Sequence, residues 1–150
     1  MDVAFKKQIV ELLDSHRIMT VATNRPDGWP QATTVGYAND GMNIYFLCGL
    51  GSQKAANLAG DDRVSVTIDS DVDQVMDIRG LSMAARATHV KDPAEGRRAM
   101  ELMFARYPEQ KDFSLPIPAP DEVRIFRLTP VVISVLDYSK GFAHTDLVEC

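Results

Sequence analysis

The sequence predicts a mainly β protein, a barrel or sandwich of antiparallel strands with flanking helices. About six or seven runs rich in β-branched and aromatic residues follow one another along the 150-residue chain. Short turns join adjacent runs, and short connections favour antiparallel neighbours. Two longer helices and one short helix are predicted among them. Because this many strands in one small unit commonly close on themselves, we expect a single domain over residues 1–150.

The chain begins with a predicted helix, strand and turn. Within residues 1–15, apolar side chains recur at positions that share one face of a helix: Phe5, Ile9, Leu12 and Leu13. Residues 18–23 are predicted as a strand, and residues 25–28 (RPDG) are a strong turn signal. Trp29 beside this turn fits an interface residue and a cap on the core equally well.

The stretch 31–60 holds the densest local signals. Residues 39–41 (NDG) separate two runs rich in Thr, Val, Tyr, Ile and Phe, which predicts a β-hairpin. After a glycine-containing loop, Ser52 is a natural N-cap for a short helix over residues 53–59, and Gly60 is placed to stop it. We therefore expect a strand, a turn, a strand, a loop and a helix in this order.

The start of this short helix predicts a phosphate site. Free backbone N–H groups and a partial positive charge attract anions to the start of a helix. Lys54 in the first turn opposes the helix dipole by roughly 0.3–1 kcal/mol unless a bound anion compensates. The alternative is a solvated lysine on a helix that binds nothing, since many short helices begin with serine after a glycine.

A strand, an acidic loop and a longer strand are predicted next. Residues 63–69 alternate between polar and apolar, the pattern of a strand with one buried face. Residues 69–73 resemble a calcium loop, but Gln74 and Gly80 stand where such a loop has its glycine and its glutamate. We therefore interpret them as an acidic surface loop. Residues 75–90 are predicted as a long strand with a bulge or bend at Gly80.

A second long helix follows. Asp92 as N-cap, Pro93 at the first helical position and Glu95 mark its start. Pro108 ends the helix, and its apolar stripe is predicted to pack in the core: Met100, Met103, Phe104 and Tyr107.

Loops and strands complete the chain. Residues 110–120, with three prolines, are predicted to form a surface loop. Residues 123–128 and 131–136 are predicted as β segments separated by Pro130, which requires a sheet edge or a kink. The polar, glycine-containing tail, residues 137–150, is predicted to be irregular.

Composition excludes several classes of function. The net charge is -5 without a run of Lys or Arg, which argues against nucleic acid or a membrane as partner. No apolar run approaches the roughly 18 residues of a membrane span, and the N-terminus lacks a secretory cleavage site. Cys48 and Cys150 do not suggest a disulfide framework. We therefore expect a cytoplasmic protein.

No catalytic side chain stands out, and no metal site is predicted. His16, His89 and His144 lie far apart and share no metal-ligand spacing. Cys48, close to a helix start, fits a nucleophile of lowered pKa, but a small buried residue of a strand is the favoured interpretation. Motifs of hydrolases and nucleotide triphosphatases are missing from the sequence. If the protein is an enzyme, we expect a cofactor to carry the reaction.

Residues 30–68, PQATTVGYANDGMNIYFLCGLGSQKAANLAGDDRVSVTI, resemble the flavin-binding core of the pyridoxamine 5'-phosphate oxidase-like family, the FMN-binding split barrels. The shared pattern is a strand ending in a turn, a second strand, Ser-x-Lys at a helix start, a third strand, an acidic loop and a glycine-containing strand. It extends over residues 18–90, and residues 128–130 are in keeping with it. The chain is most similar to the short, uncharacterised branch of the family.

The resemblance implies a homodimer of six-stranded antiparallel split β-barrels, with FMN in a groove between the subunits. The implied cofactor-binding residues form a strand along the flavin, the end of the next strand, a phosphate clamp and a glutamine at the polar edge of the flavin ring. In this order they are Ala32, Thr33, Thr34, Val35, Gly36 and Tyr37; Leu47 and Cys48; Ser52, Gln53 and Lys54; and Gln74. The amide of such a glutamine can both donate and accept, as that edge requires.

The chain also departs from the family pattern. Ala32 and Gln53 stand where the oxidases have basic residues facing the phosphate, which implies weaker FMN binding. The C-terminal substrate-recognition residues of the oxidases are not found, so pyridoxal phosphate synthesis is not expected. The implied function is an FMN-dependent oxidoreductase acting on a small-molecule substrate. Alternatives are the same fold with the deazaflavin F420 or haem, and a non-enzymatic stress-related or regulatory flavin-binding module.

Overall fold

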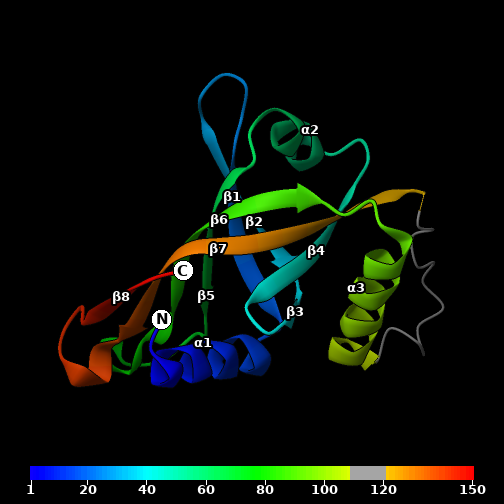
Figure 1. The fold of residues 1–150 in the computed structure, drawn as a ribbon. Coiled ribbons are helices and arrows are strands. Elements are labelled where there is room, and N and C mark those ends of the chain that lie inside the picture. Colours follow the sequence, from blue (N-terminus) through cyan, green and yellow to red (C-terminus); the bar gives the residue numbers. More distant parts are fainter. Residues whose placement is uncertain (109–120) are drawn as a thin grey trace.

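One antiparallel sheet of eight strands forms the body of the protein in a computed structural model, which describes residues 1–108 and 121–150. The strand order is β2-β1-β5-β6-β7-β4-β3, and β8 pairs with β7. The sheet curls without closing into a full barrel, so β2 and β3 remain edge strands (Figure 1). The strands are β1 (Ile18–Asn24), β2 (Pro30–Gly36), β3 (Ala38–Asp40), β4 (Asn43–Gly49), β5 (Arg63–Asp69), β6 (Arg79–His89), β7 (Val123–Asp137) and β8 (Thr145–Glu149).

Three α-helices of the described residues flank this sheet: α1 (Val3–Ser15), α2 (Gln53–Gly60) and α3 (Pro93–Arg106). Figure 1 shows α1 beneath the lower end of the sheet, α2 above its upper end and α3 beside β4. Asp2, Ser52 and Asp92 each accept a hydrogen bond from a backbone N–H of the helix that follows. The predicted helices and the mainly β architecture are therefore confirmed.

The alternation in β5 decides which face of the sheet is buried. Val64, Val66 and Ile68 point into the core, whereas the residues between them are exposed. From α1, Ile9 and Leu13 are fully buried, as the helical spacing predicted. The largest fully buried side chains of the sheet and its turns include Tyr37, Phe46, Met19, Ile44, Leu81, Leu128 and Ile133.

The first reason for eight strands rather than the implied six is a break at Tyr37. The Tyr37 N–H donates to the Arg17 carbonyl, and its hydroxyl donates to the Leu13 carbonyl at 2.7 Å. As a result β2 pairs with β1, and only the short strand β3 pairs with β4. The predicted hairpin turn at residues 39–41 is confirmed, with Gly41 at φ +58°.

The second reason is the C-terminal tail. The prediction of an irregular tail is wrong for residues 145–149, which form β8. These residues pair with residues 132–136 of β7, so their backbone groups gain partners that the sequence alone does not reveal. Residues 138–140 form a short 3₁₀ turn between the two strands.

The strand predicted over residues 75–90 starts later than expected. Residues 75–77 form a 3₁₀ turn, η1 (Val75–Asp77), and β6 follows it. The bulge predicted at Gly80 is wrong, because the register shift lies between Ala84 and Ala85. Glycine is needed at position 80 for close packing, since a Cβ atom there would lie 2.4 Å from the carbonyl oxygen of Ile68 in β5.

The two β segments predicted around Pro130 form one continuous strand, β7. On one side, β7 pairs with β6 along most of its length. On the other side, it pairs with β4 up to Leu128 and with β8 from Val132. Pro130, which cannot donate a backbone hydrogen bond, lies where this partner changes and where the β6–β7 register shifts. Pro130 thus lies at a local gap in the pairing, which agrees with the predicted sheet edge or kink.

Helix α3 is attached at both ends, through Glu95 in its first turn and Arg106 in its last. The Arg106 guanidinium donates to the carbonyls of Leu13 (3.2 Å) and His16 (2.7 Å) and to the side-chain oxygen of Asn39 (2.7 Å). The predicted apolar stripe of α3 is half-buried rather than part of the core, because α3 packs on the edge strand β3.

Other sequence-based expectations concern the surface. Trp29 is 73% exposed at the β1–β2 turn, so it does not cap the core. The loop predicted at residues 110–120 lies outside the described residues. Within residues 1–108 and 121–150, no helix is both long and apolar enough to cross a membrane.

Candidate functional site

Three of the predicted cofactor-binding segments adjoin one another: β2, the end of β4 and the start of α2. Strand β2 lies at the edge of the sheet and contacts β4. Strand β4 ends at Gly49, and α2, which begins four residues later, packs on β1 and β4. Asn57 of α2 donates to the side chain of Gln31 at the start of β2 (3.2 Å). The upper end of the sheet in Figure 1 therefore gathers these segments.

The start of α2 has the features of an anion site. The Ser52 hydroxyl accepts from the Ala55 N–H (3.2 Å) and donates to the Gly49 carbonyl (2.7 Å). The N–H groups of Gln53 and Lys54 precede the first intrahelical bond, so the helix leaves them without a partner. Lys54 is half-buried. Among the described residues, Lys7 and Lys140 form ion pairs, and Lys54 does not. A doubly charged oxyanion would satisfy both amides and the ammonium group.

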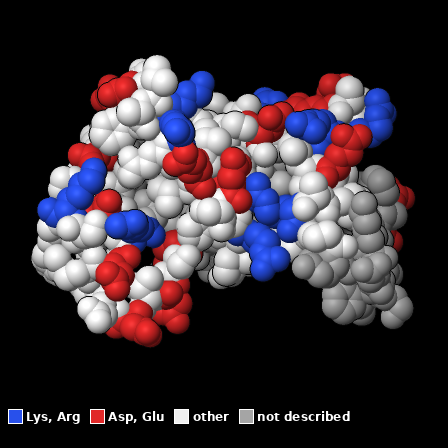
Figure 2. Space-filling view, turned by 90° about the horizontal axis from the view of Figure 1, so that it is seen from below, with Lys and Arg blue, Asp and Glu red and all other residues white. Residues whose placement is uncertain are grey.

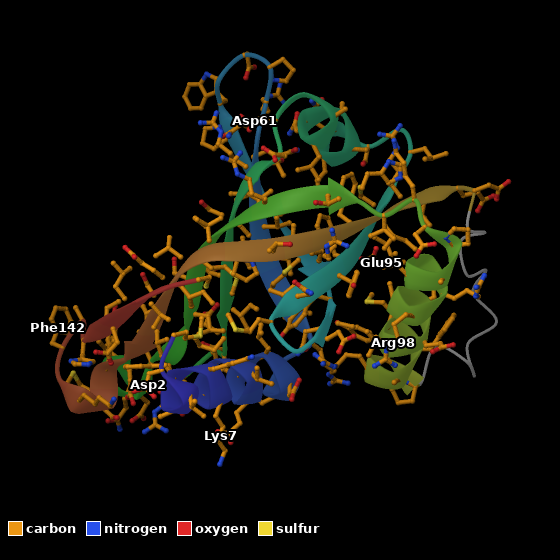
Figure 3. All side chains as sticks on the ribbon, in the orientation of Figure 1. Asp2, Lys7, Asp61, Glu95, Arg98 and Phe142 are labelled. Atoms are coloured by element: carbon orange, nitrogen blue, oxygen red, sulfur yellow. The ribbon has the colours of Figure 1, made fainter. Side chains whose placement is uncertain are left out.

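Gln53 does not extend this anion site with its side chain. Its amide nitrogen donates to the side-chain oxygen of Asn57 at 2.8 Å, one turn along α2. The helix also runs through Gly60, with Asp61 as its C-cap, instead of stopping before the glycine. Figure 3 shows Asp61 at the upper end of the sheet, between α2 and the β1–β2 hairpin.

Asn57 is a positioning residue that sequence reasoning missed. It is 1% exposed, and its amide donates to the Thr23 hydroxyl (3.0 Å) and to Gln31 (3.2 Å). These bonds fix α2 over the ends of β1 and β2. No periodic pattern in the sequence singles out Asn57, because it lies two residues after Ala55 and one before Leu58 and so shares a helical face with neither.

Cys48 is a buried residue of a strand rather than a nucleophile of lowered pKa. Its side chain is 7% exposed, and burial raises the pKa of the thiol. A hydrogen bond with Ser52 and the charges of Lys54 and Arg124 oppose this rise in pKa without reversing it. The thiol is thus kept neutral. The neighbouring Leu47 is half-buried in β4.

The predicted flavin strand is β2, and its side chains point alternately to the two faces of the sheet. Ala32 and Thr34 are exposed on the outer face, whereas Thr33 and Val35 alternate with them and are half-buried. The Thr33 hydroxyl is a buried polar group that lacks a hydrogen-bond partner in the described residues. Gly36 closes the strand beside the Tyr107 ring, whose hydroxyl oxygen would lie 2.9 Å from a Cβ atom at that glycine.

Tyr37 lies apart from this strand and inside the core. It is fully buried, and its hydroxyl and N–H groups both have backbone partners. Burial raises the pKa of its phenol far above the ordinary value. Its side chain therefore anchors α1 and is not free to contact a bound molecule.

Gln74 lies at the other end of β5 from α2. It is exposed and precedes η1 without capping it through its side chain. The distance along β5 from Val64 to Asp69 is about 17 Å, and β1 separates β2 from β5, which adds about 10 Å sideways. The structure therefore does not bring Gln74 to the start of α2, and only an elongated ligand lying along the sheet could reach both.

The outer face of the sheet is built from small side chains in cross-strand rows. The residues of the two rows named below are exposed or half-buried, so the described chain leaves this face open to solvent. Two hollows of about 310 and 350 Å³ open on this face. One row is Thr34, Thr20, Thr67 and Ser82, and the next is Ala32, Ala22, Ser65 and Ala84.

The surface charge is mixed in sign. In the view from below, acidic and basic side chains alternate over the visible described surface (Figure 2). Several of them form ion pairs, for example Arg86 with Asp62 at 2.6 Å and Arg63 with Asp61 at 2.8 Å.

The three histidines are held in separate places. His16 bonds to the Leu12 carbonyl (2.7 Å) and the Ser70 hydroxyl (2.8 Å), and His144 bonds to Asp146. His89 packs on the Phe126 ring at 5.6 Å, and burial, followed by the charges of Arg124 and Lys91, lowers the pKa of its imidazole. In the described ranges, no group of three or more His, Cys, Asp or Glu side chains is placed to hold a metal ion.

A further hollow lies away from the predicted residues. It has a volume of about 610 Å³ and an apolar lining from α3 and its neighbours, including Met100, Phe104, Val90 and Ile125. It contains none of the predicted cofactor-binding residues.

Comparison with known proteins points to one family. Residues 5–137 match the model of the family described as pyridoxamine 5'-phosphate oxidase. No curated protein matches the sequence.

Solved structures share the fold. A conserved hypothetical protein from Mycobacterium tuberculosis, Rv2991, is 28% identical over 97% of this chain and 91% of its own, with a TM-score of 0.76. A heme binding protein from Mycobacterium smegmatis is 18% identical over 99% of this chain and 58% of its own (TM-score 0.75). HutZ, the heme storage protein from Vibrio cholerae, is 22% identical over 83% of this chain and 88% of its own, with a TM-score of 0.67. At these identities the two heme proteins share the fold alone.

Proposed function

The chain belongs to the pyridoxamine 5'-phosphate oxidase family, whose model matches residues 5–137, and we propose that it is an FMN-binding flavoprotein with oxidoreductase activity. The observation that carries this proposal is the start of α2, where two backbone N–H groups and the Lys54 ammonium have no partner among the described residues. They fit the doubly charged phosphate of FMN. Bound FMN supplies hydride or electron transfer between a donor and a small substrate.

In this proposal the cofactor extends from α2 along β2. The phosphate binds at Ser52 and Lys54, and the ring end points toward the end of β2 that is level with Asp69, where Gln74 follows. The exposed Thr34 lines a small hollow with Thr67 and Asp69 on this path. We also propose a cytoplasmic location, since neither cysteine is disulfide-bonded.

The direct test is the ligand content of the protein. We expect the freshly purified protein, once denatured, to release a molecule with the absorbance spectrum of flavin, or the apoprotein to bind FMN on titration. A preparation without flavin that also fails to bind added FMN would refute the proposal. Turnover with NADH or NADPH across small oxidised acceptors then tests the oxidoreductase activity.

Replacing Lys54 with alanine should weaken FMN binding by about 1.5–3 kcal/mol, the range for a hydrogen bond to a charged group. The fold should remain intact, because Lys54 has no partner in the described chain. Fluorescence titration with FMN measures the change in Kd. Lys7→Ala is the matched control, since Figure 3 shows Lys7 projecting from α1 at the lower end of the molecule. An unchanged Kd for Lys54→Ala would place the phosphate elsewhere.

We further propose a homodimer formed through the outer face of the sheet. Small side chains at Ala22, Ser65 and Ala84 let a second copy approach closely, and the exposed Ile18 and Val131 add apolar contacts. In an isologous dimer the same patch meets itself, so the cofactor groove would lie between subunits.

A charge in this face should dissociate the dimer. Ser65→Glu places like charges near one another across the two-fold axis, which costs several kcal/mol. Sedimentation equilibrium should show a dimer for the unmodified protein and for Lys7→Glu, but a monomer with unchanged circular dichroism for Ser65→Glu. A monomeric unmodified protein, or a Ser65→Glu variant that stays dimeric, contradicts this interface.

Haem is the second candidate cofactor. Two structures with this fold come from a heme binding and a heme storage protein. The lowered pKa of His89 keeps its imidazole neutral, the form that binds iron. A Soret band that appears on haem addition and is lost in His89→Ala would favour haem, and a deazaflavin spectrum would favour F420. Flavin binding without any turnover would instead favour a regulatory module.

A further inference from the structure

Arg124 is a cation at the rim of the curled sheet that forms no ion pair with residues 1–108 or 121–150. Its Cα pairs with that of Cys48 across β7 and β4. Because side chains two residues apart share a face of a strand, Arg124 lies on the same face as Phe126 and Leu128, whose side chains are buried in the core. Arg124 itself is half-buried. It therefore sits where the core meets the upper mouth of the sheet, the end that α2 covers.

Lys54 and Arg124 come from distant parts of the chain and converge on one neighbour. The charges of both lower the pKa of the Cys48 thiol, against the larger effect of burial, and Ser52 forms a hydrogen bond with the same thiol. Cys48 is thus flanked by the N-cap of α2, the first-turn lysine and the β7 arginine. Both cations therefore lie close to Cys48, beside the residue that caps α2.

Neither cation is neutralised by an acid of the described chain. The other arginines of the central strands have carboxylate partners: Arg63 pairs with Asp61, Arg86 with Asp62 and Arg127 with Glu95. No such pair involves Arg124 or Lys54 within residues 1–108 and 121–150. Two half-buried like charges repel each other, and an anion between them would convert this repulsion into attraction.

We propose that Arg124 is a second phosphate-binding cation of the anion site at the start of α2, acting together with Lys54. This inference rests on the proposed function and adds a residue to its site. It also accounts for the departures at Ala32 and Gln53: the charge that is absent from β2 and from the first turn of α2 comes from β7. A guanidinium offers two parallel N–H groups to a phosphate, so one arginine replaces much of the lost binding.

The test compares FMN with riboflavin, which lacks the phosphate. In fluorescence titrations, Arg124→Gln should raise the Kd for FMN by about 10- to 100-fold and leave the Kd for riboflavin unchanged. Arg124→Lys should restore part of the affinity. Arg97→Gln on α3, an exposed arginine that this proposal leaves outside the site, should leave both constants unchanged. The difference between the two ligands separates phosphate binding from a structural role.

Other outcomes separate this inference from the proposed function. An unchanged Kd for FMN in Arg124→Gln, or an equal loss for FMN and riboflavin, overturns the role of Arg124 while FMN binding stands. If the protein binds no flavin, inorganic phosphate is titrated by NMR against the amide signals of Gln53 and Lys54. Shifts that depend on Arg124 would support the anion site and refute the flavin. No shift in the unmodified protein overturns both.

Discussion

Replacing Phe46 with alanine should lower the free energy of unfolding by about 3–5 kcal/mol, the usual cost of removing a buried aromatic ring. Phe46 of β4 is fully buried and stacks on Phe126 of β7 with ring centroids 5.7 Å apart. The ring thus joins two paired strands just below the mouth of the sheet. The surrounding strands hold the cavity open, since β4 is hydrogen-bonded to both β3 and β7.

Urea denaturation followed by circular dichroism measures this change. Phe46→Leu should lose much less stability, because it keeps most of the buried apolar volume. FMN binding of Phe46→Ala, measured below the denaturation range, should also weaken, since Cys48 and the start of α2 follow directly in the chain. A loss of less than about 1 kcal/mol in Phe46→Ala would show that the core between β4 and β7 can collapse around the vacancy.

Replacing Gly80 with valine should destabilise the protein by about 3 kcal/mol or more, at the upper end of the cost of overpacking. Any Cβ atom at this position would lie 2.4 Å from the Ile68 carbonyl oxygen and 3.1 Å from the Asp69 Cβ atom. The obstacle is the backbone of the neighbouring strand, which cannot move aside as a flexible side chain can. Strands β5 and β6 must therefore separate at this end.

The matched control is Gly49→Ala, also a glycine at a strand end. A Cβ atom there meets nothing within 4 Å, and its φ is not in the left-handed region, so stability should change by less than about 0.5 kcal/mol. Thermal unfolding of Gly80→Val, Gly80→Ala and Gly49→Ala gives the comparison. Equal stabilities for the two alanine variants would contradict the close approach of β5 at Gly80.

Local signals in the sequence were sufficient to predict the elements around the site. Ser52 bonds within its own first turn, and so does Asp92, so short-range chemistry fixes where α2 and α3 begin. The alternation in residues 63–69 likewise fixes which face of β5 is buried. The place of Lys54 in the first turn of α2 likewise follows from the cap at Ser52.

Where the structure differs from the sequence-based predictions, contacts between distant residues are the cause. Tyr37 was predicted as part of the flavin strand, but its hydroxyl bonds to Leu13, and this contact pulls the residue into the core. Gly80 was predicted at a bulge because a lone glycine in a strand pattern has several possible causes, and only the position of Ile68 selects close packing. The tail became β8 because β7 has a free edge beyond Leu128.

The sequence by itself determined the mainly β class, the caps of the helices and the place of Lys54 in the first turn of α2, because each depends on residues a few positions apart. Only the tertiary structure decided that Asn57 fixes α2 to β1 and β2, that Gln74 lies at the far end of β5, and that Arg124 joins Lys54 beside Cys48. These depend on strand pairing between distant segments, and the register of that pairing is set by the packing of the whole sheet rather than by any local pattern.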